Sequence, residues 1–327
     1  MKNNKKFDMV TIGDCVVDHY IVPQEYKVIS GQGSKTGWLG LKFKRKTPVT
    51  EFSMFPGGNA LNTAVGFRRL GLKTSIITSL GLQKEADLIV DRVIGEKIDP
   101  SLIKRDKNDE VDKGIVFVTA GERTIVSYHC KKKYQFPGNF STKWLYLTSL
   151  GAGFETVYKS VIAYKKKNNV KIVYNPGSRQ LRDSIGQVRK MIGNVELVFV
   201  NLEEAQRIVG SNKKTLKFLL GKLHNLGALN AVITDGQKGA FASDGSNYYR
   251  LPIFPIKRVD ATGAGDAFAS GFTAAMSYGL PTEEALKWGS INAAREISLI
   301  GVQNGLLKKN QLVNILKRNK NYKARKF

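Results

Sequence analysis

The chain of 327 residues has few cysteines and few histidines, two and three respectively. Because Cys15 and Cys130 stand in no paired spacing, a disulfide framework and a cysteine-based zinc site are disfavoured. The scattered histidines argue against a histidine-rich metal centre. No run approaches the ~18 consecutive apolar residues that span a bilayer, and the basic start of the chain lacks the apolar segment of a signal peptide. We therefore expect a cytoplasmic protein that does not enter a membrane.

Acidic residues are also few. There are 27 Asp and Glu against 52 Lys and Arg, which gives a formal net charge of +25 and a pI near 9.9. Nucleic-acid-binding proteins often have such a charge, but they also cluster it on one face and carry a recognisable module. Here the basic residues are spread along the chain, with one concentration in residues 308–327. A lysine-rich surface with a solvated tail is the simpler interpretation, so we expect no specific nucleic-acid partner. A polyanion- or RNA-binding protein is the alternative from a different class.

Apolar runs alternate with stretches of helical periodicity, which is typical of an α/β domain with a mostly parallel sheet. Phe7–Asp18 is predicted to be a buried first strand that ends in polar residues. The clearest helix is predicted by leucines at 216, 219, 220, 223 and 226. Further β-rich runs, each closing on Asn, Asp, Gly, Ser or Thr, occupy residues 74–81, 143–151, 171–177, 195–201 and 229–236. Open α/β sheets bind ligands at the carboxyl ends of their strands, so these polar ends are candidate ligand positions.

Two segments break this alternation. Residues 20–52 and 110–130 each contain two β-rich runs, the second pair around Gly121, and both are predicted to be β-hairpins inserted into the α/β domain. Together they would form a small antiparallel sheet over the strand ends, which we call the lid. No linker or internal repeat divides the chain. We therefore expect a single domain over residues 1–327 that ends, at residues 308–327, in a helix and a loose basic tail.

The most informative motif is DATGAGDAF, from Asp260 to Phe268, which leads into a helix of small residues. Thr262 is a candidate N-cap, and the N–H groups of residues 263–266 would converge at the helix start. Such a terminus binds anions. A carboxylate within the same turn would repel a bound phosphate, so its presence requires a separate explanation. Asp266 can accept a hydroxyl proton while the neighbouring N–H groups stabilise a transferring phosphoryl group. The alternative is a glycine-rich turn in which Asp266 merely favours the helix dipole.

A second glycine motif is PGGNALNTAVGFRRLG, from Pro56 to Gly71. A pair of glycines precedes a helix, and Asn59 and Asn62 lie three residues apart on one side of its first turn. Adjacent glycines let a ligand approach the backbone, and two amides offer donors and acceptors to a polyol. A loop followed by an N-capped helix is the alternative that needs no ligand.

Weaker signals follow other predicted strands. Asp18 can hold two sugar hydroxyls through its two oxygens, or it can cap the junction between a strand and a loop. Asn201 and Glu204 suit a water-mediated Mg²⁺ ion or a phosphate oxygen. The glycines of the segment Thr234–Gly239 can let the backbone touch the phosphate or ribose of a nucleotide.

The two glycine motifs resemble those of the ribokinase-like (PfkB) family of carbohydrate kinases, GGxxxN in the first quarter of the chain and DTxGxGDxF near its end. Here they stand as Gly57–Asn62 and Asp260–Phe268, and the early Asp18, N-x-x-E at 201–204 and T-x-G-x-x-G at 234–239 agree in order. The resemblance covers about residues 7 to 305. It implies a doubly wound, mostly parallel sheet with a β lid. It also implies transfer of the γ-phosphoryl group of ATP, with Mg²⁺, to a sugar-like hydroxyl.

The resemblance further implies a role for each matching residue, with Asp266 as the catalytic base. The anion hole would consist of Gly263, Ala264 and Gly265. The acceptor would contact Asp18, Gly58, Asn59 and Asn62. The nucleotide would contact Asn201, Thr234, Gly236, Gly239 and Asn292. Glu204 would hold Mg²⁺ through water, and Asp260 and Thr262 would help to bind a monovalent cation such as K⁺, with Ala261 replacing the usual Thr or Ser.

One departure from the family pattern bears on the substrate. Asn59 stands where ribokinases and the sugar-phosphate kinases of the family commonly carry lysine, which weakens the case for a phosphorylated sugar. We therefore rank unphosphorylated sugars of the ribose, fructose or ketodeoxygluconate type first, nucleosides second and sugar phosphates third. The basic lid stretch GWLGLKFKRK matches no substrate pattern. If the protein forms a homodimer, we expect the lid to provide the contact.

Overall fold

The structure is a computed structural model that describes residues 5–30, 37–119, 122–212 and 215–327. The strands of its large sheet are β1 (Lys5–Ile12), β6 (Thr74–Leu80), β7 (Ile103–Arg105), β10 (Phe140–Leu147), β11 (Lys171–Tyr174), β12 (Leu197–Asn201), β13 (Asn230–Thr234), β14 (Ala240–Ser243), β15 (Tyr248–Leu251) and β16 (Arg325–Lys326). They lie in the order β16-β15-β14-β13-β12-β11-β10-β1-β6-β7. The strands from β13 to β7 are parallel, and β14, β15 and β16 extend one edge antiparallel. The predicted strands therefore form the predicted, mostly parallel sheet.

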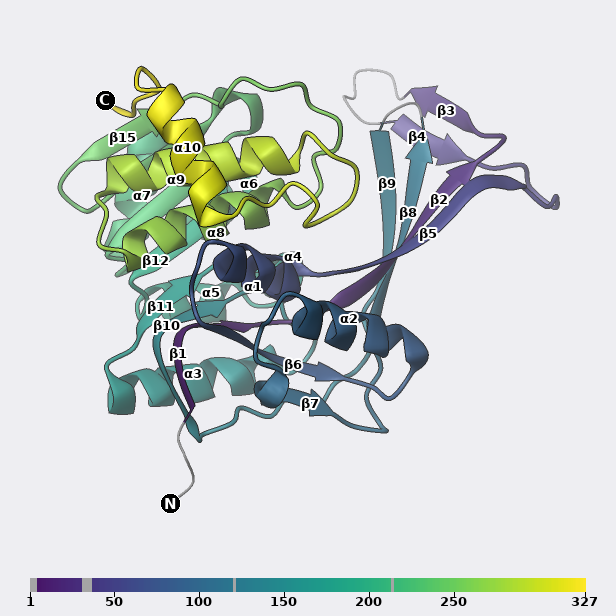
Figure 1. The fold of residues 1–327 in the computed structure, drawn as a ribbon, viewed down its shortest axis with the longest axis horizontal. Helices are drawn as coiled ribbons and strands as arrows, with labels where there is room; N and C mark the ends of the chain where they lie inside the picture. Colours follow the sequence, from purple (N-terminus) through teal and green to yellow (C-terminus); the bar gives the residue numbers. More distant parts are fainter. Residues whose placement is uncertain (1–4, 31–36, 120–121, 213–214) are drawn as a thin grey trace.

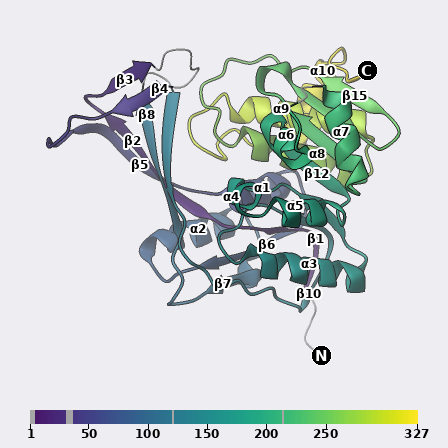
Figure 2. The ribbon, with the colours of Figure 1, turned by 180° about the vertical axis from the view of Figure 1, so that it is seen from behind.

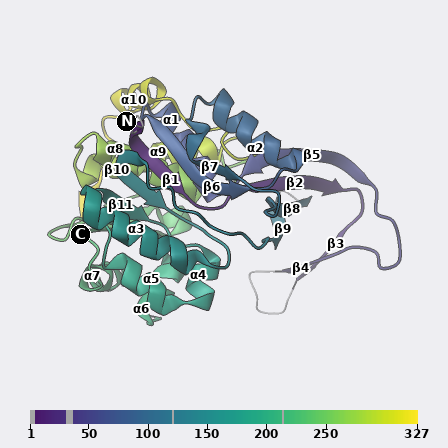
Figure 3. The ribbon, with the colours of Figure 1, turned by 90° about the horizontal axis from the view of Figure 1, so that it is seen from below.

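Helices cover both faces of this sheet (Figure 3). One layer contains α3 (Phe154–Asn168), α4 (Ser178–Asp183), α5 (Ile185–Ile192), α6 (Leu202–Val209) and α7 (Leu216–Asn225). The other contains α1 (Asn59–Arg69), α2 (Lys84–Gly95), α8 (Ala264–Ser277), α9 (Thr282–Glu296) and α10 (Lys309–Arg318). Two short 3-10 turns are also present. One, η1 (Pro100–Leu102), lies between α2 and β7, and the other, η2 (Gly236–Lys238), lies between β13 and β14. Each layer buries its own apolar cluster against the sheet, which makes the domain doubly wound.

The lid is a separate small sheet that projects to one side of the domain (Figures 1 and 2). Its strands are β2 (Val16–Pro23), β5 (Val49–Gly57), β8 (Asp112–Thr119) and β9 (Glu122–Tyr128), in the order β5-β2-β8-β9. A short hairpin of β3 (Lys27–Ser30) and β4 (Gly37–Gly40) lies between β2 and β5 in the chain. The prediction of an antiparallel lid was wrong, because β2 and β8 pair in parallel. The predicted turn residue Gly121 lies outside the described residues.

The first predicted strand is in fact two strands in two sheets. The chain leaves β1 at Ile12 and enters the lid at Val16. A Cβ atom at the intervening Gly13 would lie 2.8 Å from the carbonyl oxygen of Ser149, so only glycine fits this crossing. As a result Asp18 lies within a lid strand instead of at the end of a core strand.

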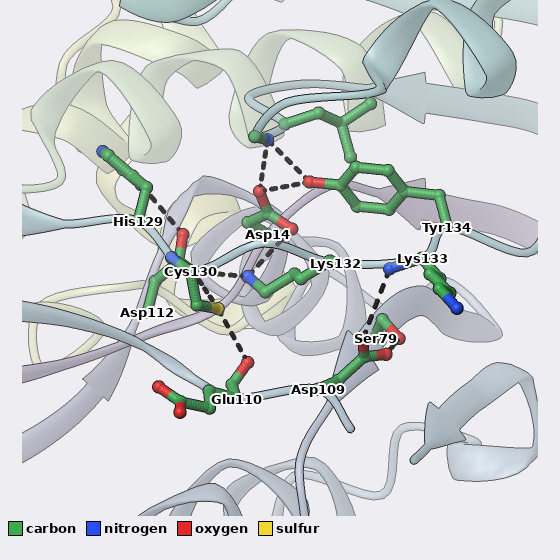
Figure 4. A network of polar contacts seen from close by, with 12 residues as sticks. Asp14, Ser79, Asp109, Glu110, Asp112, His129, Cys130, Lys132, Lys133 and Tyr134 are labelled. Atoms are coloured by element: carbon green, nitrogen blue, oxygen red, sulfur yellow. Dashed lines mark hydrogen bonds and ion pairs between the residues drawn. The ribbon is translucent and has the colours of Figure 1, made fainter. Parts of the chain in front are cut away.

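A buried ion-pair cluster fixes the lid to the core (Figure 4). The side chain of Lys132 is fully buried, and its Nζ lies 3.1 Å from Asp14 and 2.6 Å from Asp112. The Tyr134 hydroxyl and the Gly151 N–H also donate to Asp14, at 2.8 and 2.6 Å. Asp14 follows β1, Asp112 begins β8 and Lys132 follows β9, so the cluster joins three points where the chain passes between the two sheets.

The end of the chain is held in place, which corrects the prediction of a loose tail. After α10, strand β16 pairs antiparallel with β15. The Phe327 N–H donates to the Tyr248 carbonyl at 3.1 Å, and the Phe327 ring packs against Phe241 and Tyr248. Among the residues that the structure describes, no helix has both the length and the hydropathy to cross a membrane.

Candidate active site

Most of the predicted site residues meet at the carboxyl edge of the parallel strands. Strand β12 ends at Asn201 and β13 at Thr234, and both residues line a polar cavity of about 300 Å³. The same cavity is lined by Glu204 of α6 and Asp266 of α8. The strand order reverses between β1 and β10, so the edge includes a topological switch point, where α/β sheets usually bind ligands.

Helix α8 begins at the glycine-rich motif. Its N-cap is Gly263, with φ 77°, and no side chain caps the helix, so the prediction that Thr262 is the N-cap was wrong. A left-handed residue at this point favours glycine. Gly263, Ala264 and Gly265 all line the polar cavity. The first turn of α8 therefore presents its N–H groups and the positive end of its dipole to the cavity, as an anion site requires.

Asp266 lies in the first turn of α8 and is 8% exposed. Burial raises its pKa to about 7, a hydrogen bond from Asn62 acts against this rise, and the nearby carboxylate of Glu296 adds to it. The Asn62 Nδ2 donates to Asp266 Oδ2 at 2.8 Å. A carboxyl group with a pKa near neutrality can both ionise and take up a proton at working pH, which suits a general base.

Helix α1 and the turn before it lie beside Asp266. Asn62 is buried in the first turn of α1, and Asn59 lines the polar cavity. Gly58 has φ 92°, and a Cβ atom there would lie 2.8 Å from the Asp14 carbonyl oxygen, so both conformation and space require glycine.

Asp18 reaches the same space from lid strand β2. A Cβ atom at Gly57 would lie 3.1 Å from Asp18 Oδ2 and 3.9 Å from Asn62 Oδ1, so the two side chains flank that glycine. A Cβ atom at Gly114 of β8 would overlap Asp18 Oδ1. Burial raises the pKa of Asp18, and the nearby His19 and Arg123 lower it. The arrangement leaves a carboxylate and an amide to hold neighbouring hydroxyls.

A second, mainly apolar cavity of about 400 Å³ lies next to the polar one. It shares Thr234, Ala264, Gly265 and other residues with the polar cavity, so the two are continuous. Its apolar walls come from β14 to α9 and include Phe254, Ile256, Ala293 and Ile297. Gly236 and Gly239, which the sequence analysis predicts to contact a nucleotide, line this cavity. An apolar end joined to a polar end matches the base and the phosphates of a nucleotide.

Asn201 and Glu204 have a structural role that the sequence analysis missed. Asn201 Oδ1 accepts from the Glu204 N–H at 2.9 Å, and Glu204 Oε2 accepts from the Asn201 N–H at 2.9 Å. This is the capping box of α6, which the N-x-x-E pattern itself could have indicated. Glu204 also lines the polar cavity, and burial raises the pKa of its carboxyl. A carboxylate held in place at the polar cavity fits a water-mediated Mg²⁺ ion.

The oxygens predicted to bind a monovalent cation have another partner. Nη1 of Arg123, from lid strand β9, donates to Asp260 Oδ1 and to Thr262 Oγ1. Asp260 also accepts from the N–H groups of Thr262 and Gly301, at 2.7 and 2.8 Å. Because the guanidinium supplies the positive charge at these oxygens, the side chains of Asp260 and Thr262 do not fit a monovalent cation in this structure.

The structure also contradicts a nucleotide contact by the Asn292 side chain. Asn292 is fully buried in α9. Its Nδ2 donates to the Ala267 carbonyl at 2.8 Å, and its Oδ1 accepts from the Leu307 N–H at 3.0 Å. The amide therefore joins α8 and α9 to the loop that follows α9. The sequence alone also did not single out Gly114 or Gln303 as site residues, because the fold brings them to the site from distant segments.

The fold and this site define a class of protein, the phosphotransferases that have an alcohol group as acceptor. More narrowly, the chain belongs to the pfkB family of carbohydrate kinases, whose model matches residues 8–309. The resemblance inferred from the two glycine motifs is thereby confirmed.

Individual relatives differ in the substrate that their names give. An ATP-dependent 6-phosphofructokinase of Thermoanaerobacterium thermosaccharolyticum is 24% identical over 318 residues, which cover 91% of this chain and 90% of that protein. A cytidine kinase of Thermococcus kodakarensis is 40% identical over 138 residues, which cover 40% of this chain and 48% of that protein. Among solved structures, the nucleoside kinase of Methanocaldococcus jannaschii has a TM-score of 0.79 at 18% identity and covers 96% of this chain and 100% of that chain. The fold predicted from the sequence is thus confirmed.

Proposed function

We propose that the protein transfers the γ-phosphoryl group of ATP to a hydroxyl group of a small unphosphorylated sugar, with Asp266 as the general base. The observation that carries this proposal is the position of Asp266, a buried carboxyl with a pKa of about 7 in the first turn of α8. The N–H groups beside it suit a phosphoryl group, and its own oxygen suits the proton of an attacking hydroxyl.

In this reaction the sugar lies between the lid and α1, where Asp18, Gly58 and Asn62 hold it. The base and ribose of the nucleotide occupy the apolar cavity, and its phosphates extend into the polar one. Asp266 takes the proton of the acceptor hydroxyl as oxygen attacks the γ-phosphorus, and the first turn of α8 stabilises the charge on the transferring group. Glu204 would hold Mg²⁺ through water, and that ion supplies neutralising charge to the phosphates.

Closure of the lid over the acceptor would exclude water, which otherwise competes for the phosphoryl group. Exposed apolar side chains on the lid support the expectation that a homodimer, if one forms, uses this sheet. Phe52 of β5 is 56% exposed, and Met54 of β5 and Ile125 of β9 are also exposed. We further propose a cytoplasmic location, since both cysteines are free thiols.

A nucleoside is the second candidate acceptor. The observation that favours it is the segment of 138 residues that is 40% identical to a cytidine kinase. A nucleoside offers the same ribose hydroxyls to Asp18 as a free sugar does, and its base would have to fit between the lid strands and the core.

A coupled assay of ADP release tests these proposals. Ribose, fructose, 2-keto-3-deoxygluconate, cytidine, adenosine and hexose phosphates are each offered with ATP and Mg²⁺. We expect turnover with at least one sugar or nucleoside and its loss in Asp266→Asn. The absence of turnover with every acceptor contradicts the kinase proposal, and turnover with nucleosides alone selects the second candidate.

The same preparation tests the alternative of RNA binding, which the net charge of +25 raises. Adsorption that disappears at moderate salt reflects charge alone. Tight binding with a sequence preference at that salt concentration would instead support the RNA-binding alternative.

A further inference from the structure

Gln303 lies behind the proposed catalytic base, in the loop between α9 and α10, and is 1% exposed. Its Nε2 donates to the main-chain carbonyl of Pro56 at 3.0 Å and to Asn62 Oδ1 at 2.8 Å. Asn62 Nδ2 in turn donates to Asp266 Oδ2 at 2.8 Å. Two amides thus connect a main-chain carbonyl to the carboxylate that the proposed function uses as its base.

The carbonyl of Pro56 determines which group donates and which accepts in each of these hydrogen bonds. The carbonyl of Pro56 can only accept, so the Gln303 amide must turn its Nε2 toward it. The same nitrogen then faces Asn62 and requires an acceptor there, which is Oδ1. Asn62 is left with its Nδ2 toward Asp266. An amide has nearly the same shape when flipped, so shape alone would not select this orientation.

The loop around Gln303 is itself held from two helices. The Gln303 N–H donates to Glu296 Oε1 at 2.5 Å, and its carbonyl accepts from Arg69 Nη1 at 2.5 Å. The residue has φ 73°, a left-handed conformation that is uncommon outside glycine. These contacts fix the backbone, and with it the position from which the side chain reaches Asn62.

We propose that Gln303 is a positioning residue for phosphoryl transfer, because it orients the Asn62 amide so that an N–H group, not an oxygen, faces Asp266. The proposal rests on the proposed function in one respect, the role of Asp266 as base. Without Gln303 the Asn62 amide can flip, and its oxygen would then face a carboxylate oxygen. That arrangement is repulsive unless Asp266 is protonated, so the ionised base becomes harder to form.

The expected effect is a shift of the acidic limb of the pH–rate profile. Loss of the hydrogen bond that stabilises ionised Asp266 should raise the midpoint by roughly one pH unit. With a starting pKa of about 7, the ionised fraction at pH 7 then falls about fivefold. At pH 9 the base is ionised in both proteins, so kcat/KM should return to near the wild-type value. A purely structural defect would reduce activity at every pH.

The other titratable groups near Asp266 are the same in the wild-type protein and in variants at Gln303. Glu296 of α9 raises the pKa of Asp266. Glu204 of α6 lines the same cavity, and the Tyr146 hydroxyl of β10 is close enough for Asp266 to affect its pKa. Because the variants alter none of these groups directly, a shift confined to Gln303 variants reports the orientation of the Asn62 amide.

The test compares Gln303→Met, which keeps the volume of the side chain, with Gln187→Met on α5 as the matched control. In the pH profile of kcat/KM for the acceptor, the midpoint of the acidic limb should shift to higher pH in Gln303→Met and stay unchanged in Gln187→Met. In an Asn62→Ala background, Gln303→Met should add nothing. An unmoved limb, or an equal loss at pH 7 and pH 9, overturns the proposal.

A second measurement needs no turnover and separates this proposal from the proposed function. The carboxyl carbon of Asp266 is titrated by NMR in the wild-type protein and both variants, without substrate. A higher midpoint in Gln303→Met alone supports the positioning role even if no acceptor is phosphorylated, and an unchanged midpoint contradicts it. If Gln303→Met does not fold, Gln303→Leu replaces it. Leucine donates to neither Pro56 nor Asn62 and adds no charge, so a shift in the same direction is expected and its absence contradicts the proposal.

Discussion

Replacing Asp266 by asparagine should make the folded protein more stable at neutral pH while it removes the activity. Burial raises the pKa of the Asp266 carboxyl from 3.8 to about 7. The folded protein therefore binds a proton that the unfolded chain releases between these two values, so raising the pH through this window favours unfolding. The asparagine variant has no such proton, and its amide oxygen can still accept the hydrogen bond from Asn62.

The magnitude follows from the two pKa values. Each pKa unit corresponds to about 1.36 kcal/mol, so the raised pKa of Asp266 lowers the unfolding free energy by roughly 2 kcal/mol at pH 5 and roughly 4 kcal/mol at pH 8. Between these pH values the wild-type protein should lose roughly 2 to 3 kcal/mol of unfolding free energy relative to Asp266→Asn. Asp266 is 8% exposed, so solvent screens this effect little. Burial also raises the pKa of Glu296 to about 7, but Glu296 is present in both proteins.

Urea unfolding of both proteins at pH 5, 6, 7 and 8 gives this difference directly. We expect the two stabilities to diverge as the pH rises to 7 and to run nearly parallel above it. In parallel kinetic measurements, kcat of the variant should fall at least 10²-fold, the lower end for loss of a general base, with ATP binding little changed. Stability curves that are parallel throughout would show that Asp266 has an ordinary pKa. Near-normal turnover would remove it from the role of base.

Three further outcomes test other parts of the structure. Gly114→Ala should raise KM for the acceptor at least tenfold in steady-state kinetics and leave KM for ATP unchanged, because the new Cβ displaces the carboxylate of Asp18. Gly138→Ala, with open space around it, is the control. Lys132→Met should lower the unfolding free energy by about 3–5 kcal/mol in urea, since two buried carboxylates lose their partner, whereas the exposed Lys133→Met should change it by less than about 0.5 kcal/mol. Activity should be equal in K⁺ and tetramethylammonium buffers, because Arg123 already supplies the charge; activation by K⁺ would contradict this.

Much of the core could be predicted from the sequence because its strands are continuous apolar runs that end in polar residues. The runs at 74–81 and 229–236 correspond to β6 and β13 within two residues. Periodicity does not indicate which sheet a strand joins, and for that reason Phe7–Asp18 was predicted as one strand. The glycine at residue 13, between its two halves, was the available signal of a break.

The site could be predicted only where its residues share a local motif. Asp266 and the glycines before it are adjacent in the chain, so their convergence at a helix start follows from the sequence. Gln303 and Arg123 reach the site from a loop and a lid strand, and no local pattern indicates their partners. Asn292 is the opposite case, since its position matched the family pattern but its side chain is occupied by two main-chain hydrogen bonds.

In the proposed reaction, the division of the site between two sheets separates the residues for phosphoryl transfer from those that hold the acceptor. Asp266 and its N–H groups belong to α8, which is packed against the core sheet, and α8 is buried along nearly its whole length. Asp18 belongs to the lid, whose root is fixed by the buried Lys132 cluster. A change of lid sequence can therefore alter which hydroxyls are held without moving the base. This reasoning agrees with the names of the two relatives described above, a 6-phosphofructokinase and a cytidine kinase.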